Sequence, residues 1–265
     1  MNPLRAAIVR GARHVHAGGT VARGARPGAG YVFDRLRGYA EGDDPRRIDW
    51  SATARIGSLQ TRVYLEETVL VLGALVDESP SMRLGRKRAL SVAAGEAVRA
   101  WFGAAESTDR AGRIVDDRLV GDRRATVEVQ AAGPFDLRRS LELSVRVLPQ
   151  GSSFLLITDG LDLGASGAFD DVLLRIGRRF DATVLLARDP WIDGLPLRGF
   201  VRIRDAESAR TKRVFIGPRS RERYRRASAE RDAAIEGRFR VARWRIGTLE
   251  EADGAASLER TFGLR

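Results

Sequence analysis

The sequence predicts an α/β fold built on a doubly wound, mostly parallel sheet, and three patterns in its larger C-terminal part carry that prediction. Apolar runs of strand length recur, amphipathic helical stretches separate them, and two of the runs end in acidic loops. Continuous apolar runs are typical of strands buried on both faces of a parallel sheet. Their alternation with helices favours a sheet that is covered by helices on both sides.

The elements of this sheet domain, expected over residues 67–265, follow one another in order. The predicted strands are Thr68–Val76, Arg113–Val115, Thr126–Val129, Ser153–Thr158, Ala182–Ala187 and Arg240–Ile246. The predicted helices, from their apolar residues at helical spacing, are Lys87–Phe102, Asp136–Val147, Asp170–Arg179, Ser220–Ile235 and Ser257–Phe262. Between the last two strands, the runs Gly199–Arg204 and Lys212–Ile216 predict a hairpin insertion at about 197–217.

Two segments precede the sheet domain. Residues 1–27 are rich in Gly, Ala and Arg, so we expect a flexible segment with at most a short helix over Met1–Ala12. Residues 28–66 are expected to be a small β-rich segment with strands at Tyr31–Leu36 and Leu59–Tyr64. The two histidines, His14 and His16, lie in the first segment, which disfavours both a metal-binding pair and a Ser–His–acid catalytic set.

Composition narrows the class of protein. The 265 residues include no Cys, which excludes disulfides and thiolate chemistry. No stretch approaches the roughly 20 apolar residues of a membrane helix, and the apolar group after Arg5 is too short for a signal peptide, so we expect a cytoplasmic protein. The net charge is +11, but the arginines are spread among Asp and Glu, and no aromatic-plus-basic platform is visible. The sequence therefore argues against nucleic acid as a partner.

Polar side chains follow two of the buried strands at the point where each strand ends. The first loop is Asp77-Glu78-Ser79-Pro80-Ser81, and the second contains Thr158-Asp159-Gly160. The carboxyl ends of the strands of an open α/β sheet meet at one edge, where ligands bind. Oxygen ligands of this kind suit Mg²⁺, with Ser79 and Ser81 as direct ligands and with Asp77 and Asp159 acting through water or neighbouring groups. The alternative is a pair of ordinary turns, because Ser and Asp also cap helices.

The pattern D-x-S-x-S after a buried strand, with a later T-D-G, resembles the metal-ion-dependent adhesion site of von Willebrand factor A domains. The resemblance implies a Mg²⁺ that accepts a carboxylate from a protein partner. It also implies a Thr ligand on a middle loop, but Phe135 stands about where that Thr is expected. Either Asp136 or a water replaces the missing ligand, or metal binding is weak or lost.

A second resemblance lies upstream and covers roughly residues 28–265. The chain is similar to a bacterial family called domain of unknown function 58, whose hallmark residues are matched here by Phe33, Tyr39, Gly42, Asp43, Arg47, Asp49, Trp50 and Arg55. We expect a structural role for this hallmark, with Trp50 plugging the segment against the core, and the alternative is a catalytic or binding cluster. Pairs of Asp and Arg would fix the loop, and Arg55 and Arg62 would pair with acids such as Glu66 and Glu67. The resemblance implies a MoxR-type AAA+ ATPase as partner.

These observations favour a non-enzymatic module for protein interaction and assembly. One alternative is a metal-dependent hydrolase, for which Glu78 and Asp162 are the nearby candidates for a general base. Another alternative is a basic scaffold that binds nucleic acid, which the charge of +11 keeps open.

Overall fold

The computed structural model divides the chain into two compact units. One consists of Met1–Gly24 with Leu70–Arg265, and the other is Ala25–Val69. For residues 13–16, 27–35 and 63–68 only the backbone is described. The structure describes residues 2–16, 27–115, 118–121, 135–164, 167–187, 191, 198–206 and 210–264.

Within the described residues the larger unit is built on a six-stranded sheet with five parallel strands, which agrees with the predicted mostly parallel α/β sheet, although β5 was not predicted. Its strands lie in the order β10-β7-β6-β3-β4-β5, and only β5 is antiparallel to its neighbour. The chain therefore starts in the middle of the sheet, builds one half, and returns to build the other from β6. The predicted strand Thr126–Val129 lies outside the described residues. The strands are β3 Val71–Val76, β4 Arg110–Val115, β5 Arg118–Val120, β6 Ser153–Thr158, β7 Asp181–Ala187 and β10 Arg245–Leu249.

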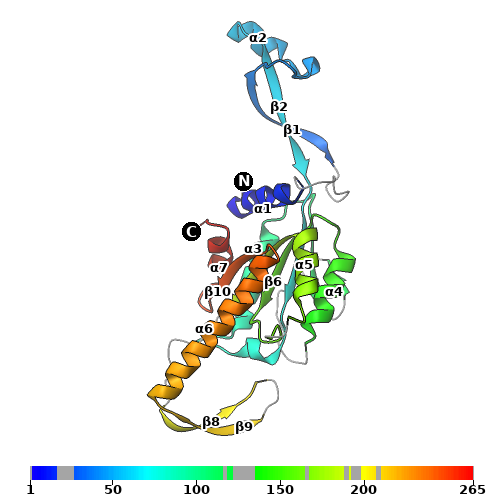
Figure 1. Ribbon diagram of the computed structural model, residues 1–265. Coiled ribbons are helices and arrows are strands. Elements are labelled where there is room, and N and C mark those ends of the chain that lie inside the picture. The colour runs from blue at the N-terminus through cyan, green and yellow to red at the C-terminus, as the bar shows by residue number, and fades with distance from the viewer. Residues whose placement is uncertain are drawn as a thin grey trace. The chain divides into compact units, whose positions relative to one another are not determined.

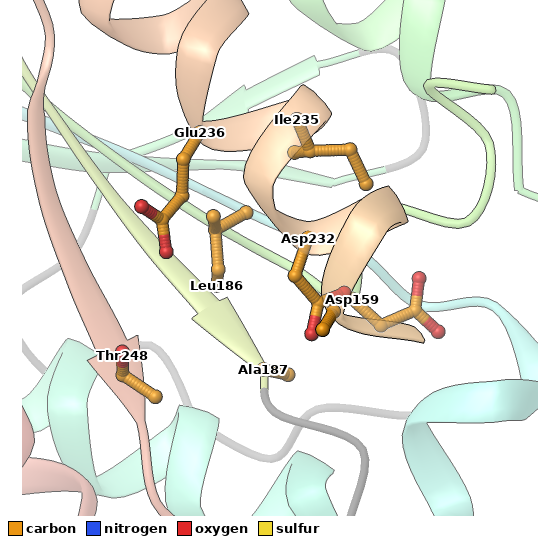
Figure 2. Close-up of a pocket in the computed structure, with 8 residues that line it drawn as sticks. Asp159, Leu186, Ala187, Asp232, Ile235, Glu236 and Thr248 are labelled. Carbon is orange, nitrogen blue, oxygen red and sulfur yellow. The ribbon is translucent and has the colours of Figure 1, made fainter. Parts of the chain in front are cut away.

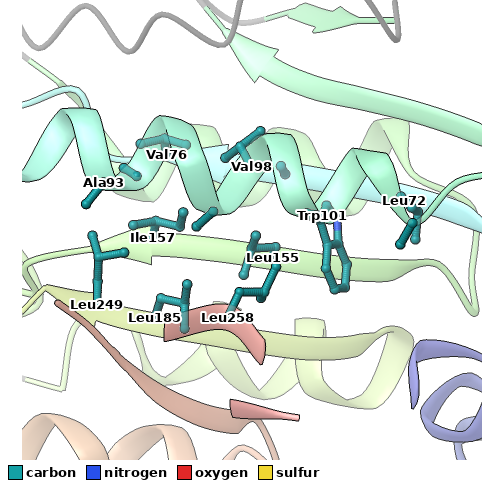
Figure 3. Packing of buried hydrophobic residues seen from close by; sticks show 14 of the residues in the cluster. Leu72, Val76, Ala93, Val98, Trp101, Leu155, Ile157, Leu185, Leu249 and Leu258 are labelled. Atoms are coloured by element: carbon teal, nitrogen blue, oxygen red, sulfur yellow. The ribbon is translucent and has the colours of Figure 1, made fainter. Parts of the chain in front are cut away.

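Helices cover both faces of this sheet (Figure 1). Successive residues of a strand point to opposite faces. Accordingly, Leu72 and Ala74 of β3 belong to one buried cluster and Leu75 to the other. Figure 3 shows the first cluster, with Trp101 lying against the sheet. The helices α1 Pro3–His16, α3 Leu90–Gly103 and α7 Gly254–Thr261 contribute to that cluster, and α4 Leu137–Val147, α5 Asp170–Arg179 and α6 Pro218–Val241 contribute to the second.

The short helix considered for Met1–Ala12 is present and packs against the core, while residues 17–26 of the same segment lie outside the described residues. Pro3–His16 forms α1, which is buried along one side by Leu4, Ile8 and Ala12. Their spacing of four residues places them on one helical face. Arg5, also buried, forms an ion pair with Asp109, whose carboxylate in addition accepts hydrogen bonds from the amides of Leu70 and Glu106. The Gly- and Arg-rich composition of the segment hid this apolar stripe.

The boundaries of the C-terminal elements also differ from the predicted ones. Helix α6 continues to Val241, because Phe239 on its last turns is fully buried. The chain turns at Arg243, which has a φ of 64°, and β10 therefore begins at Arg245 rather than at Arg240. Helix α6 is the longest helix described, but it is rich in Arg. Within the described ranges no helix has both the length and the apolar character needed to cross a bilayer.

The predicted hairpin insertion is present as a separate two-stranded ribbon, β8 Gly199–Arg204 with β9 Thr211–Ile216. The smaller unit is also a hairpin, of β1 Pro27–Gly38 with β2 Gln60–Thr68.

Two short helices, η1 Pro45–Arg47 and α2 Trp50–Ile56, connect β1 with β2. The sequence analysis missed α2, although Asp49 caps its N-terminus and Gly57 ends it with a φ of 77°. These are the usual signals of a helix start and stop.

The burial of α1 leads to a prediction about stability. Replacing the fully buried Ile8 by Ala removes apolar contacts and leaves a cavity, so we expect Ile8→Ala to lower the free energy of unfolding by about 2–5 kcal/mol. The exposed Arg10 on the same helix is the control, and Arg10→Ala should change stability by about 0.5 kcal/mol or less. Urea denaturation measures both, and equal stability of the two variants would show that α1 is not part of the folded core.

Candidate functional site

Asp77 occupies the first position after β3 and is almost completely buried, with 1% of its surface exposed. Strands β3 and β6 are neighbours and pair Val76 with Ile157, so the loops after both strands begin side by side. The Asp77 amide continues this pairing by donating to the carbonyl oxygen of Ile157 at 2.8 Å. The point where the sheet reverses its strand order lies between these two strands, which is where ligands bind in open α/β sheets.

The Asp77 carboxylate joins the two loops. One oxygen accepts a hydrogen bond from the amide of Ser79 at 2.9 Å, and the other accepts one from the hydroxyl of Thr158 at 2.7 Å. The Thr158 hydroxyl in turn accepts from the amide of Gly160 at 3.0 Å. Gly160 has a φ of 74°, a conformation that favours glycine and turns the chain directly after β6. Sequence reasoning treated Thr158 only as part of a motif, but its hydroxyl links the loops.

Ser79 and Ser81 are brought together by the turn that follows. Pro80–Arg83 forms the short helix η2, and the hydroxyl oxygens of Ser79 and Ser81 lie 2.9 Å apart. Both residues are 5% exposed. The Ser79 side chain does not cap η2, so the capping alternative for this residue fails. Two buried hydroxyl groups therefore face each other at the end of β3.

Asp159, the remaining predicted metal-site residue, lies at the same edge of the sheet and is half-buried. Its Oδ1 accepts a hydrogen bond from the amide of Leu161 at 2.9 Å. Asp159 and Ser81 line a common pocket of about 150 Å³. Leu84, Leu90, Leu161 and Trp191 supply most of the apolar wall of this pocket.

A second pocket, of about 260 Å³, lies between α6 and the ends of β7 and β10, and Asp159 also lines it. Figure 2 shows Asp232 and Glu236 of α6 with Asp159 around this pocket. Across the described part of the chain, no three Asp, Glu or His side chains are arranged so that they could hold a metal ion. A cation at this edge would therefore need hydroxyl groups and water among its ligands.

Phe135 and Asp136 are the residues at the end of the middle loop that the structure describes. Phe135 is half-buried and packs against the cluster on the α4 side of the sheet, so its ring has a structural role. Asp136 caps α4 by accepting a hydrogen bond from the amide of Arg139 at 2.9 Å. Its proposed role as a substitute metal ligand stays a prediction, and residues 122–134 before it lie outside the described part.

Glu78 lies between Asp77 and Ser79 in the first loop, and its carboxylate pairs with a residue of the neighbouring strand. It forms an ion pair with Arg113 of β4, which is itself buried. This pairing orients the Glu78 carboxylate towards the neighbouring strand. The other candidate base, Asp162, is exposed in the turn after β6.

The chain that leaves η2 is held by the C-terminal part of the sheet domain. The Glu251 carboxylate accepts hydrogen bonds from the amides of Arg86 and Lys87 at 2.7 and 2.6 Å. Arg88 makes two hydrogen bonds of 2.6 Å to Glu96 of α3, and Glu96 also accepts one from the amide of Gly254. The Arg88 guanidinium lowers the pKa of Glu96 from its ordinary value of 4.5. Sequence reasoning missed this cluster, because its members are up to 165 residues apart.

The hallmark residues lie in the smaller unit and form a local network. Asp43 accepts hydrogen bonds from Arg37 at 2.5 Å and from the amide of Ala40, and the Arg37 contact lowers the pKa of its carboxyl group. Asp49 caps α2 through the amide of Ala52 and pairs with Arg62 at 2.9 Å, and both contacts lower its pKa. Asp–Arg pairs of the predicted kind are thus present, and the expected pairing of Arg55 and Arg62 with Glu66 or Glu67 involves side chains outside the described part.

The other hallmark residues have simpler surroundings. Gly42 has a φ of 98°, and Tyr39 donates a hydrogen bond from its hydroxyl to the carbonyl oxygen of Asp43. Arg55 donates to the carbonyl oxygen of Ser51, and Arg47 is exposed. Phe33 lies on β1, and its side chain is outside the described part.

Trp50 is 67% exposed at the first position of α2 within the smaller unit, and its packing against the core stays a prediction. Ile56 and Leu59 of the same unit are also exposed. Capping by Asp49 and the buried Ala52 position α2.

Comparison with known proteins identifies one family whose model spans parts of both units of the chain. A family model described as "Protein of unknown function DUF58" matches residues 35–234, a span that includes the two loops and every hallmark residue except Phe33. Uncharacterized proteins Rv1480 of Mycobacterium tuberculosis strain H37Rv and Mb1516 of Mycobacterium bovis are each 27% identical to this chain over 228 residues, covering 79% of this chain and 71% of the relative. No solved structure gives a significant match.

The Glu96 cluster leads to a pH-dependent prediction. Since its pKa is lowered on folding, Glu96 stabilises the folded state above pH 4.5, and this contribution is lost as the pH falls through the lowered pKa. We expect Glu96→Gln to lower the free energy of unfolding at pH 7 by about 1–3 kcal/mol, with a smaller difference below about pH 4. The control Glu230→Gln changes an exposed pair with Arg226 and should have little effect. Denaturant titrations at pH 7 and pH 3.5 test this, and a difference that does not depend on pH would contradict it.

Proposed function

Since this chain belongs to the DUF58 family of proteins of unknown function, we propose that it is a non-enzymatic module that binds a protein partner through an adhesion-type Mg²⁺ site. In this proposal the six-stranded sheet is a von Willebrand factor A-like domain. Renumbered from β3, its strand order is 3-2-1-4-5-6, the order of doubly wound folds that bind ligands at the strand ends. The observation that carries the proposal is the pair of buried hydroxyl groups of Ser79 and Ser81.

The separation of these hydroxyl groups fits Mg²⁺. Neighbouring ligands of an octahedral Mg²⁺, each about 2.0–2.1 Å from the ion, are about 2.9–3.0 Å apart. The Ser79 and Ser81 oxygens are 2.9 Å apart, a distance that also suits the hydrogen bond between them. The two serines lie beside the point where the sheet reverses its strand order. This position supports a metal-binding role, because a purely structural pair of serines would not need to lie there.

Each nearby residue has a role in the proposed site. Ser79 and Ser81 are the direct ligands, and Asp77 holds the Ser79 backbone and Thr158 in place. Asp159 supplies negative charge at the rim. Phe135 provides no ligand atom, so water fills the position for which the family resemblance implies a Thr. With few carboxylates bound directly, Mg²⁺ would supply an electrophilic position for a carboxylate.

The surroundings suit a protein partner. The pocket next to Ser81 has room for one apolar side chain, and Leu84 and Leu161 at its walls are each 47% exposed. A partner segment with an Asp or Glu beside an apolar residue would fill both positions. A MoxR-type AAA+ ATPase, the partner implied by the family resemblance, is our proposed source of this segment. The ion pair of Glu78 with Arg113 gives the hydrolase alternative no support.

Metal binding by the two serines is directly testable. We expect Ser79→Ala with Ser81→Ala to weaken Mg²⁺ binding at least tenfold, because both direct ligands are lost, while the melting temperature without metal changes little. The matched control is Ser91→Ala, a buried serine on α3. Isothermal titration with Mg²⁺ measures binding, and unchanged affinity in the double variant would refute the proposed ligands.

The double serine variant and the Ser91→Ala control can also be tested for binding to the protein partner. A MoxR-type ATPase encoded beside this chain's gene should be retained on immobilised wild-type protein in Mg²⁺ and lost in EDTA. It should also be lost with the double serine variant and retained with Ser91→Ala. Retention that is insensitive to EDTA and to both serines would contradict the proposed site as the docking point.

A further inference from the structure

The β8–β9 ribbon presents an aromatic and basic face that the linear sequence does not reveal. In the observed register Phe200 pairs with Phe215 and Arg202 with Arg213, followed by Arg204 with Thr211. Because alternate residues of a strand share a face, these three pairs lie on one side of the ribbon. The Phe200 and Phe215 rings are 5.1 Å apart, and their residues are 80% and 57% exposed. We call this side the Phe–Arg face.

The opposite side of the ribbon is less exposed towards α6, whereas Ile203 and Lys212 farther from that helix are exposed. Val201 and Val214 are half-buried there, and Ile216 is buried. The Ser220 hydroxyl on the first turn of α6 donates to the carbonyl oxygen of Phe215, which fixes the ribbon to the start of that helix. The Phe–Arg face is therefore the side that is open to a ligand.

Positive charge is concentrated in the stretch of sequence that contains the ribbon and the start of α6. Residues 198–226 contain eleven Arg or Lys and three Asp or Glu, an excess of eight, while the whole chain has a net charge of +11. Within the part that the structure describes, Arg202, Arg204 and Arg213 form no ion pair. Exposed, unneutralised arginines beside two exposed rings are the features of a surface that binds a polyanion with stacking groups.

We infer that the Phe–Arg face binds single-stranded nucleic acid, with bases stacked on Phe200 and Phe215 and phosphates bound by Arg202, Arg204 and Arg213. Arginine suits this role because its planar guanidinium binds phosphate through two hydrogen bonds. Six residues of strand span about 20 Å, which is long enough for only a few nucleotides. The inference is independent of the metal site, which lies at the ends of β3 and β6.

Two other anionic partners fit the face less well. A membrane-inserting hairpin would carry its apolar side chains at the free end, but here Asp205 and Arg210 are at that end and the Phe pair is next to α6. An acidic peptide would neutralise the arginines but would leave the two exposed rings without a stacking partner. The sequence-based argument against nucleic acid does not hold for this ribbon, because the pairing register brings the rings and arginines together.

Fluorescence anisotropy with a labelled 20-nucleotide oligo-dT tests the inference on the full chain. We expect Phe200→Ala with Phe215→Ala to weaken binding at least tenfold at fixed salt, with little change in the salt dependence. Arg202→Ala with Arg213→Ala should instead reduce the slope of log K against log salt by about 1.4, since each phosphate contact contributes about 0.7. The control Arg175→Ala with Arg178→Ala removes the same charge from exposed positions of α5 and should behave like wild type.

Several results would overturn the inference. They are absence of oligo-dT binding, equally tight binding of a 20-base-pair duplex, and an equal loss of binding in the α5 control. Binding of phosphatidylglycerol vesicles or polyglutamate in preference to oligo-dT would overturn it as well, and would identify the other partner class. If the Ala variants do not fold, Phe200→Leu with Phe215→Leu keeps apolar bulk, and full retention of binding by that variant would also refute stacking.

Discussion

The buried carboxylate of Asp77 is the interaction on which the site depends. A carboxylate in the interior is costly unless its oxygens are hydrogen-bonded. Here each oxygen has a partner, the Ser79 amide on its own loop and the Thr158 hydroxyl on the neighbouring strand. The same contacts that satisfy the charge therefore set the position of both loops. A change at Asp77 would disturb the fold and the site together, which is why the serines are the better probes.

The order of the strands in the sheet determines which residues surround the Asp77 carboxylate. Because the chain starts at β3, goes outwards to β5 and returns at β6, two loops far apart in sequence begin side by side. The result is an oxygen-rich edge that contains the hydroxyl groups of Ser79, Ser81 and Thr158 and the carboxylates of Asp77 and Asp159. The hydrogen bonds of Glu251 and the Arg88–Glu96 pair then hold the chain between η2 and α3. In physical terms the site is supported by residues from β3, β6 and the loop after β10.

The strands, the helices and their alternation could be predicted from the sequence, because they depend on patterns of residues that are close together in the chain. The apolar runs Val71–Val76 and Ser153–Thr158 are buried strands, and their parallel pairing follows from the alternation with helices. The two acidic loops could be placed at one edge for the same reason. The burial of α1 was missed because its three apolar contacts are diluted by Gly and Arg.

Features that depend on register or on long-range pairing could not be predicted. The Phe–Arg face exists only because Phe200 is opposite Phe215, and a shift of one residue would place the rings on opposite sides. The pairing of Arg62 with Asp49 likewise depends on how the segment around α2 folds back on β2. Phe135 is a feature that the sequence alone reveals. A phenylalanine side chain has no atom that could bind a metal ion at the position where the family resemblance implies a Thr.

The central claim is that the Ser79–Ser81 pair is a divalent metal site. The most direct measurement is an anomalous difference map from crystals grown with Mn²⁺ as a stand-in for Mg²⁺. If Ser79 and Ser81 bind the metal, we expect a peak about 2 Å from both serine hydroxyl oxygens, with water completing the coordination. A well-ordered loop with the two hydroxyl groups still hydrogen-bonded to each other and no anomalous peak at millimolar Mn²⁺ would contradict it.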